Sequence, residues 1–596
     1  MEEKLMEQPQ RPESSALHEL DLVADLVAEW DVPIPMRDGV VLRADVFRPV
    51  GDAPSPVLLS YGGYGKNLPI QVAYPAAWRI LLKQRPEVLV GSSGQLMSWE
   101  LPDPERWIPL GYTLVRVDAR GTGRSPGVMD NMSSPEADDI YDAVEWAAAQ
   151  SWSTGKIGLT GVSYMAIVQW TAASRNPPHL SAICPWEGAS DWYRDVSRHG
   201  GILSDFASSW YQGQPLKIQH GTGPRGWRNP FTGEPAAGAE ELSDEALVRN
   251  RQDLSIGMRE QEFDGDYYRA RSGRFDDIKV PLLSAGNWGG QGMHLRGNVE
   301  GFTNAASKHK WLEIHGGNHW TRFYSDEGVE LQRRFFDFFL KGEGDWGNEP
   351  PVLLQIRHPG EIFVARKEQE WPLARTEWTP FYLNPADSMI GVTLPTADTT
   401  ATFDALGQGL DLRTKPFRET TEITGPLACH LWVSSSGTDA DLFVVVRLFD
   451  PDGIEAFFEG SVDTRVPLTQ GWLRASHREL DIQLSRPDRP YHSHARALPL
   501  TPGEPVELAI EVWPTSIVVP TGYSLGLTVL GRDFDHGRRD AEEGMMAIES
   551  TGVGPFTHRD PEDRAAGTLE NLRITVHSSA EHPSYLLVPI IPGGEA

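Results

Sequence analysis

Up to about residue 345, hydrophobic and polar positions along the chain alternate between two patterns. Short continuous apolar runs are typical of strands buried on both faces of a parallel sheet, and between them lie stretches with helical periodicity. The runs cover residues 56–61, 111–118, 157–160, 180–185, 280–286 and 310–315, and the helical stretches include 136–150 and 328–340. This alternation predicts an α/β domain built on a parallel sheet.

The start of the chain has a different pattern. Residues 1–29 are polar and charged at first and are expected to form a leader helix or a frayed arm. Residues 32–49 form two alternating segments around Arg37-Asp38-Gly39, which predicts a β-hairpin.

Two further regions interrupt or end the α/β alternation. Residues 191–279 are rich in Trp, Arg, Gln and Asp, with helical patches at 244–251 and 260–271, and are expected to form an inserted helical cap. From about residue 350, short β-rich segments separated by Pro/Gly turns predict an antiparallel sandwich or jelly roll. The expected division is therefore a catalytic domain at 1–190 and 280–345, a cap at 191–279 and a β domain at 346–596.

Composition and charge exclude several classes of protein. The net charge of −29 opposes nucleic-acid binding and indicates a soluble chain. No run approaches the roughly 18 apolar residues of a membrane span, and no signal peptide is evident, so a cytoplasmic protein is expected. The only cysteines, Cys184 and Cys429, lie too far apart in sequence to indicate a disulfide framework or a cysteine-based zinc site.

Residues 156–170 contain the clearest chemical signal. An apolar strand runs into Gly161-Val162-Ser163, and a helical pattern follows. A strand, a tight turn with serine at its apex and then a helix is the pattern of a nucleophile elbow. Met165 stands where the common motif has its last glycine, and a Gly-x-Ser before a helix also fits an ordinary N-cap.

A serine nucleophile needs a base and donors for an oxyanion. His319 lies in a loop beyond the strand that His315 ends, so it is the candidate base. Two histidines four residues apart suggest a metal site only if a third ligand is near, and none stands at useful spacing. Tyr64, on a glycine-rich loop after an early strand, is a candidate oxyanion donor, and a packed tyrosine on a glycine turn is the alternative interpretation.

Several motifs, taken together, resemble one family. They are Met36-Arg37-Asp38-Gly39 with Arg48-Pro49, Tyr64-Gly65-Lys66, Gly111-Tyr112 through Ser125, Trp146 through Trp152 with Gly155-Lys156, Gly161-Val162-Ser163-Tyr164, and Gly471 through Arg478. In this order they are similar to the cocaine esterase and X-Pro dipeptidyl-peptidase family of serine hydrolases (peptidase family S15, CocE/NonD). The resemblance covers nearly the whole chain after residue 30.

The resemblance implies an α/β-hydrolase domain with a helical cap inserted after the sixth strand and a C-terminal jelly roll. By position, Ser163 is the implied nucleophile and His319 the base, and the Tyr64 hydroxyl and the Tyr164 amide form the oxyanion hole. Two features depart from the family. Ala166 replaces a glycine, and the loop at 286–294, where the family carries its aspartate after a Gly-Trp pair, contains no carboxylate.

The missing acid directs attention to the preceding strand. Glu187 follows the strand at 180–185, and the carboxyl ends of parallel strands lie at one edge of the sheet. Neighbouring strands are about 4.8 Å apart, so a glutamate on one strand further away is expected to reach the imidazole. The alternatives are that Glu187 pairs with Arg194 or caps the turn, and that Asn287, Gln291 or no acid at all supports the histidine.

The sequence therefore predicts an acyl hydrolase that cleaves small-molecule carboxylic esters, with no cofactor and no metal, as a monomer or a homo-oligomer. The first alternative is an X-Pro dipeptidyl-peptidase or amidase of the same family, which needs a carboxylate for a substrate ammonium. Acidic residues of the expected cap are candidates for it, although a solvated helix explains them as well: Glu260, Glu262, Asp264 and Asp266. The second alternative is a non-catalytic binding protein, since a protein can keep a hydrolase fold after losing the activity.

Overall fold

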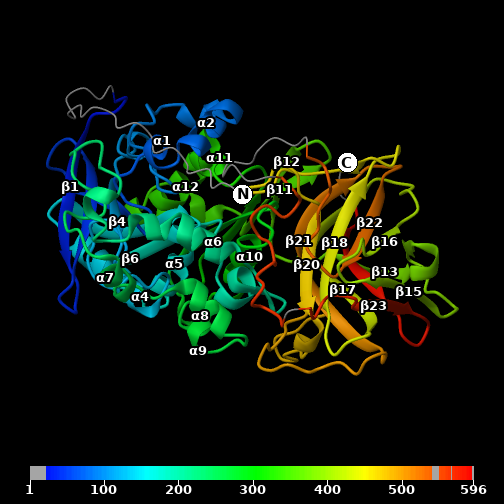
Figure 1. The fold of residues 1–596 in the computed structure, drawn as a ribbon. Helices are drawn as coiled ribbons and strands as arrows, with labels where there is room; N and C mark the ends of the chain where they lie inside the picture. The colour runs from blue at the N-terminus through cyan, green and yellow to red at the C-terminus, as the bar shows by residue number, and fades with distance from the viewer. Residues whose placement is uncertain (1–21, 540–549, 566, 594–596) are drawn as a thin grey trace.

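The computed structural model describes residues 22–539, 550–565 and 567–593 of the 596-residue chain. It contains two units side by side, one of mixed helices and strands and one made almost entirely of strands (Figure 1). The expected leader lies mostly outside the described residues. Its last part belongs to strand β1 (Leu26–Pro35), which pairs antiparallel with β2 (Val41–Pro49) and confirms the predicted hairpin.

The first unit is built on a 10-stranded sheet in the order β1-β2-β4-β3-β5-β6-β9-β10-β11-β12. Pairing is parallel from β4 through β11 and antiparallel at both ends. The remaining strands are β3 (Ser55–Gly62), β4 (Thr113–Asp118), β5 (Ser153–Val162), β6 (Leu180–Trp186), β9 (Leu282–Asn287), β10 (Lys310–His315), β11 (Val352–His358) and β12 (Ile362–Glu368). The apolar runs of the sequence thus form the central strands.

This sheet does not end where the sequence indicates. β11 pairs in parallel with β10, and β12 returns antiparallel beside β11, so the sheet continues to Glu368 rather than to residue 345. The amino-acid sequence does not mark this boundary. β11 alternates buried and half-buried positions, as the strands of the following β unit do.

Helices cover the sheet and connect its parallel strands. The longer ones are α2 (Pro75–Gln84), α4 (Ser134–Ala148), α5 (Tyr164–Ala173), α10 (Leu295–Asn304) and α12 (Asp326–Phe336). α12 continues as a π-helical segment over Asp337–Lys341, which Gly342 ends with φ 73°. Shorter helices are α1 (Ile70–Ala73), α3 (Pro104–Trp107) and α11 (Thr321–Tyr324). Because the central strands are parallel, the loops after β3, β5, β6, β9 and β10 emerge at one edge of the sheet.

The segment between β6 and β9 contains the short helices α6 (Phe206–Gly213), α7 (Asp244–Arg249), α8 (Leu254–Glu260) and α9 (Asp266–Arg269), and a small hairpin of β7 (Arg198–His199) and β8 (Ile202–Leu203). The helical patch expected at 260–271 is only partly helical. α8 ends at Glu260 and α9 begins only after Gly265, a residue of low helix propensity.

The second unit holds a 12-stranded sheet of mostly antiparallel strands. The path from β17 onward closes on itself, because β24 follows β13 at the end of the path and also pairs with β17. The strands are β13 (Glu377–Asn384), β14 (Met389–Gly391), β15 (Thr399–Asp404), β16 (Leu410–Arg413), β17 (Thr421–Ser435), β18 (Asp441–Phe449), β19 (Glu455–Ala456), β20 (Thr469–Arg474), β21 (Val506–Val519), β22 (Ser524–Leu530), β23 (Arg573–Ser578) and β24 (Tyr585–Ile591).

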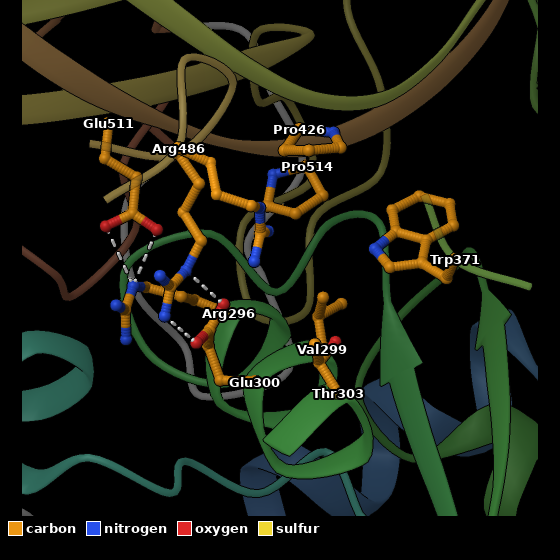
Figure 2. A pocket seen from close by; sticks show the side chains of 10 residues that line it. Arg296, Val299, Glu300, Thr303, Trp371, Pro426, Arg486, Glu511 and Pro514 are labelled. Carbon is orange, nitrogen blue, oxygen red and sulfur yellow. Dashed lines mark hydrogen bonds and ion pairs between the residues drawn. The ribbon is translucent and has the colours of Figure 1, made fainter. Parts of the chain in front are cut away.

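The two units share a continuous interface. Side chains from α10, β10 and β11 form one apolar cluster with side chains from β18, β20 and β21 of the second unit. At its margin Arg296 of α10 pairs with Glu511 of β21 (Figure 2). Glu300 of α10 pairs with Arg489. Burial of this kind fixes α10 and the loop before it against both units.

The predictions about membrane spans and disulfides can be compared with the described residues. None of the helices in residues 22–539, 550–565 and 567–593 is long and apolar enough to cross a membrane. Cys184 and Cys429 are both buried and unpaired with each other.

Candidate active site

Ser163 lies at the turn between β5 and α5, with φ 57° and ψ −112°. A positive φ is strained for a residue with a side chain, and such strain persists only where surrounding contacts hold it. Here the Ser163 amide donates to the carbonyls of Trp186 and Glu187, at 3.1 and 3.2 Å. Gly161 makes the turn possible, because a Cβ at this position would lie 2.5 Å from the Met165 Cβ. The elbow is thus anchored to the end of β6.

Glu187, immediately after β6, receives hydrogen bonds from several sides. Its Oε2 accepts from His319 Nδ1 at 2.7 Å, and its Oε1 accepts from His315 Nε2 at 3.1 Å. Asn287 Nδ2 and Ser461 Oγ also donate to it, at 3.2 and 3.1 Å. Burial alone would raise the pKa of Glu187, but the charge of His319 and the hydrogen bonds of both imidazoles hold it well below its usual range. Glu187 is therefore a carboxylate.

His319 is held between two carboxyl groups. Its Nδ1 is bound to Glu187, and its Nε2 lies 3.4 Å from Glu100 Oε1. Burial acts to lower the pKa of His319, but Glu187 and Glu100 together raise it to about 9. At neutral pH the ring is accordingly an imidazolium until one of these contacts changes.

His294 is the site residue that sequence reasoning missed. Its Nε2 lies 3.2 Å from Ser163 Oγ, and its ring stacks on that of His319 with centroids 4.7 Å apart and planes 14° apart. Burial and the charge of His319 hold the pKa of His294 well below its usual range, against an opposite effect of Glu187. The only signal in the sequence is its place at the end of the glycine-rich loop after β9, where a carboxylate rather than an imidazole is expected.

Glu100 was also missed, because it lies in a loop without a motif. Its backbone has φ 63°, and its carbonyl accepts a hydrogen bond from the Val162 amide, which holds it beside the elbow. Only 3% of the residue is exposed, and burial raises the pKa of its carboxyl although His319 acts in the opposite direction.

Three side chains of the site are close enough together to be considered as metal ligands. The ligand atoms of Glu187, His294 and His319 all lie within 4.8 Å of one another. Imidazole lone pairs lie in the plane of the ring, and zinc ligands must converge at about 2.0–2.1 Å. The two rings are stacked and nearly parallel, so their lone pairs run side by side rather than toward one point. This geometry suits proton transfer better than tetrahedral coordination.

The rings of the two candidate tyrosines, Tyr64 and Tyr164, are in contact, with centroids 5.7 Å apart. The Tyr64 hydroxyl accepts a hydrogen bond from Trp210 Nε1 at 3.0 Å, and burial raises its pKa well above the usual range. It therefore keeps its own proton for donation. The Tyr164 hydroxyl donates to Glu136 at 2.8 Å, while its amide is the first of α5 and has no intrahelical acceptor.

The residues named as alternatives for the acid have other partners. Arg194 pairs with Asp191 and Asp264 rather than with Glu187. Asn287 contacts Glu187, not the imidazole of His319, and Gln291 donates to carbonyls of the second unit. Among the acidic residues considered for a substrate ammonium, Glu260, Glu262 and Asp266 are exposed.

Comparison with known proteins covers both units. Residues 38–321 match the model of the X-Pro dipeptidyl-peptidase (S15) family, and residues 344–587 match that of the X-Pro dipeptidyl-peptidase C-terminal non-catalytic domain. A CocE/NonD family hydrolase from Staphylococcus aureus superimposes with a TM-score of 0.83 and 31% identity, covering 98% of this chain and 99% of the other.

Two curated relatives show the range of activities in this group. Cocaine esterase of Rhodococcus sp. (strain MB1 Bresler) is 26% identical over 94% of this chain and 98% of the relative. A putative Xaa-Pro dipeptidyl-peptidase of Streptomyces avermitilis is 23% identical over 74% of this chain and 70% of the relative.

Proposed function

This chain belongs to the CocE/NonD hydrolase family and is a hydrolytic enzyme of the ester hydrolase or peptidase type; from that premise we propose that it cleaves carboxylic esters through an acyl-enzyme on Ser163. The observation that carries the proposal is the convergence of three separate segments. The elbow after β5, the carboxylate after β6 and the imidazole after β10 meet at one edge of the sheet.

In this mechanism Glu187 holds the Nδ1 proton of His319, so that Nε2 is the nitrogen that exchanges protons. Ser163 Oγ attacks the substrate carbonyl while its proton passes to His319 Nε2, which then protonates the leaving alcohol. A water molecule repeats the sequence on the acyl-enzyme and regenerates Ser163. His319 must first be neutral, so the two carboxyl groups around it make the reaction favour alkaline pH.

The oxyanion of the tetrahedral intermediate needs donors on the opposite side of the reacting carbon. We assign the Tyr64 hydroxyl and the Tyr164 amide to this role. The bond from Trp210 supports the assignment of Tyr64, because it occupies an acceptor lone pair and leaves the hydroxyl proton available. Trp210 belongs to α6, and for that reason we infer that residues 191–279 form a cap over the site. The closed antiparallel path of the second unit favours a jelly roll.

The peptidase or amidase alternative has one observation in its favour. A substrate ammonium needs a buried carboxylate near the scissile bond, and Glu100 is such a group, with its Oε2 left without a hydrogen-bond partner among the described residues. The non-catalytic alternative depended on the lack of a carboxylate beside His319, and Glu187 stands there.

Two measurements test the proposal. A fluorophosphonate probe should label wild-type enzyme on Ser163 and leave Ser163→Ala unlabelled, as read by peptide mass spectrometry. Comparison of kcat/KM for aryl esters and X-Pro anilides of graded acyl size should favour the esters. Labelling elsewhere would remove Ser163 from the mechanism, and preference for the anilides would favour the peptidase.

A further inference from the structure

The imidazole of His294 is the group that the nucleophile actually contacts. Its Nε2 lies 3.2 Å from Ser163 Oγ, and His294 is 4% exposed. The mechanism above, on which this inference rests, gives His294 no task. A buried imidazole in contact with a reacting oxygen affects that oxygen in every step.

The direction of this hydrogen bond follows from the other ring nitrogen. Nδ1 of His294 is buried and has no hydrogen-bond partner among the described residues. A neutral imidazole carries one proton, and an orphaned buried N–H is rarer and more costly than an orphaned lone pair. The ring is neutral, because burial and His319 oppose its charge and because His294 stands at the N-terminus of α10, where a positive charge is unfavourable. The proton therefore sits on Nε2, which donates to Ser163 Oγ.

We propose that His294 is a catalytic residue whose Nε2–H donates to Ser163 Oγ and stabilises the negative charge that this oxygen gains during attack and deacylation. His294 neither gains nor loses a proton in this role. The Ser163 proton still passes to His319 and from there to the leaving group. His319 thus transfers the proton, and His294 donates a hydrogen bond. A hydroxyl oxygen accepts through its lone pairs while its proton stays free to leave, so the bond from His294 is compatible with transfer of that proton to His319.

Two substitutions separate a donor from a base. The amide N–H of a glutamine reaches about as far as Nε2 and donates, but it cannot accept the serine proton at useful pH. Leucine fills similar space without a donor. We expect His294→Gln to keep kcat within about tenfold of wild type. We expect His294→Leu to lose about 10²- to 10³-fold in kcat with little change in KM, as when one donor to a developing oxyanion is removed.

The acid limb of the kcat/KM profile provides a second readout. It should persist in His294→Gln, since His319 remains the titrating base. His179→Leu, which removes an exposed histidine paired with Glu145, is the control and should behave as wild type.

Each other outcome overturns the inference. Loss of activity in His294→Gln to the level of His319→Ala would make His294 a base, and full activity in His294→Leu would make it a bystander. The melting temperatures of both variants show whether each one folds. If His294→Leu does not fold, the activity of His294→Gln alone distinguishes a donor from a base. Ser163→Ala is measured in parallel: turnover in that variant defeats the proposed function itself, whereas an inactive Ser163→Ala beside an active His294→Leu defeats only the role of His294.

Discussion

At the scale of single residues, the site consists of buried carboxyl and imidazole groups, each of which affects the protonation of its neighbours. Glu187 stays ionised because two imidazoles and two further donors surround it. His319 takes its charge from the two carboxyl groups beside it, while His294, stacked on it, stays neutral. Neighbouring charges thus give two adjacent histidines opposite protonation states.

The first prediction concerns the nucleophile and its base. Ser163→Ala and His319→Ala should each remove nearly all turnover and leave the melting temperature within a few degrees of wild type. Since residues of one catalytic unit act together, the double variant should be little slower than either single variant. Single losses that simply multiply would show that the two residues act independently.

The second prediction concerns the oxyanion. Tyr64→Phe should lower kcat by about 10²-fold and change KM little, because the hydroxyl serves the transition state more than the bound ester. Trp210→Phe is the matched control, since it removes the indole donor to Tyr64 but keeps the phenol. An unchanged kcat in Tyr64→Phe would assign the oxyanion hole to other donors.

The third prediction concerns pH. Because Glu187 and Glu100 raise the pKa of His319 to about 9, kcat/KM should rise with pH through an apparent pKa above 6.5. Glu187→Gln removes a negative charge that favours the imidazolium, so its limb should move to lower pH. Its kcat should still fall about 10³- to 10⁴-fold, because the ring loses its orienting acceptor. Asn287→Ala, which loses a donor to Glu187 only, should cost far less; a Glu187→Gln enzyme with the wild-type profile would contradict this account.

At the scale of elements, the strands were the most predictable part. A strand buried on both faces is mostly apolar, and β3 and β4 are buried at every position, although β4 also buries Arg116 and Asp118. The elbow was also predictable, because it needs a fixed order of strand, turn and helix. The end of the sheet was not, since β11 looks like a strand of either unit. Glu100 and His294 were missed because their role depends on contacts between distant loops, which leave no local pattern.

The helix that begins after His294 gives a prediction at this scale. α10 packs closely on the loop after β6, where a Cβ on Gly297 would lie 2.5 Å from the Ser190 backbone nitrogen. Gly297→Ala should therefore destabilise the enzyme by about 1–3 kcal/mol, despite the better helix propensity of alanine. It should also lower kcat, because α10 carries His294. Gly213→Ala, in α6 with open space around it, is the control, and equal melting temperatures would refute the tight contact.

At the scale of the whole molecule, the second unit reaches into the site. Ser461, in a loop before β20, donates to Glu187 Oε2, and its carbonyl accepts from the His319 amide at 3.0 Å. Its own amide donates to the Gly289 carbonyl in the loop that leads to His294. One residue of the unit that resembles a non-catalytic domain thus contacts all three segments that surround the base.

The last prediction follows from this contact. Ser461→Ala should lower kcat about fivefold with unchanged KM, which is the effect of losing one hydrogen bond of about 1 kcal/mol to the orienting carboxylate. Ser550→Ala removes another buried hydroxyl of the same unit, one bound to Asp463 rather than to a site residue, and should leave kcat unchanged. Equal kinetics in both variants would mean that the second unit supports the fold alone.

The carboxylate that holds His319 stands after β6, whereas the resembling family carries it after β9. A genome survey that identifies active members by an aspartate in the loop after β9 would classify this chain as a pseudoenzyme. Trp186-Glu187-Gly188 together with His319 provides a different search pattern, and it should gather homologues whose acid has migrated to the neighbouring strand. In such homologues we expect the glutamate after β6 to be kept and the loop after β9 to vary, because it is the glutamate that contacts His319.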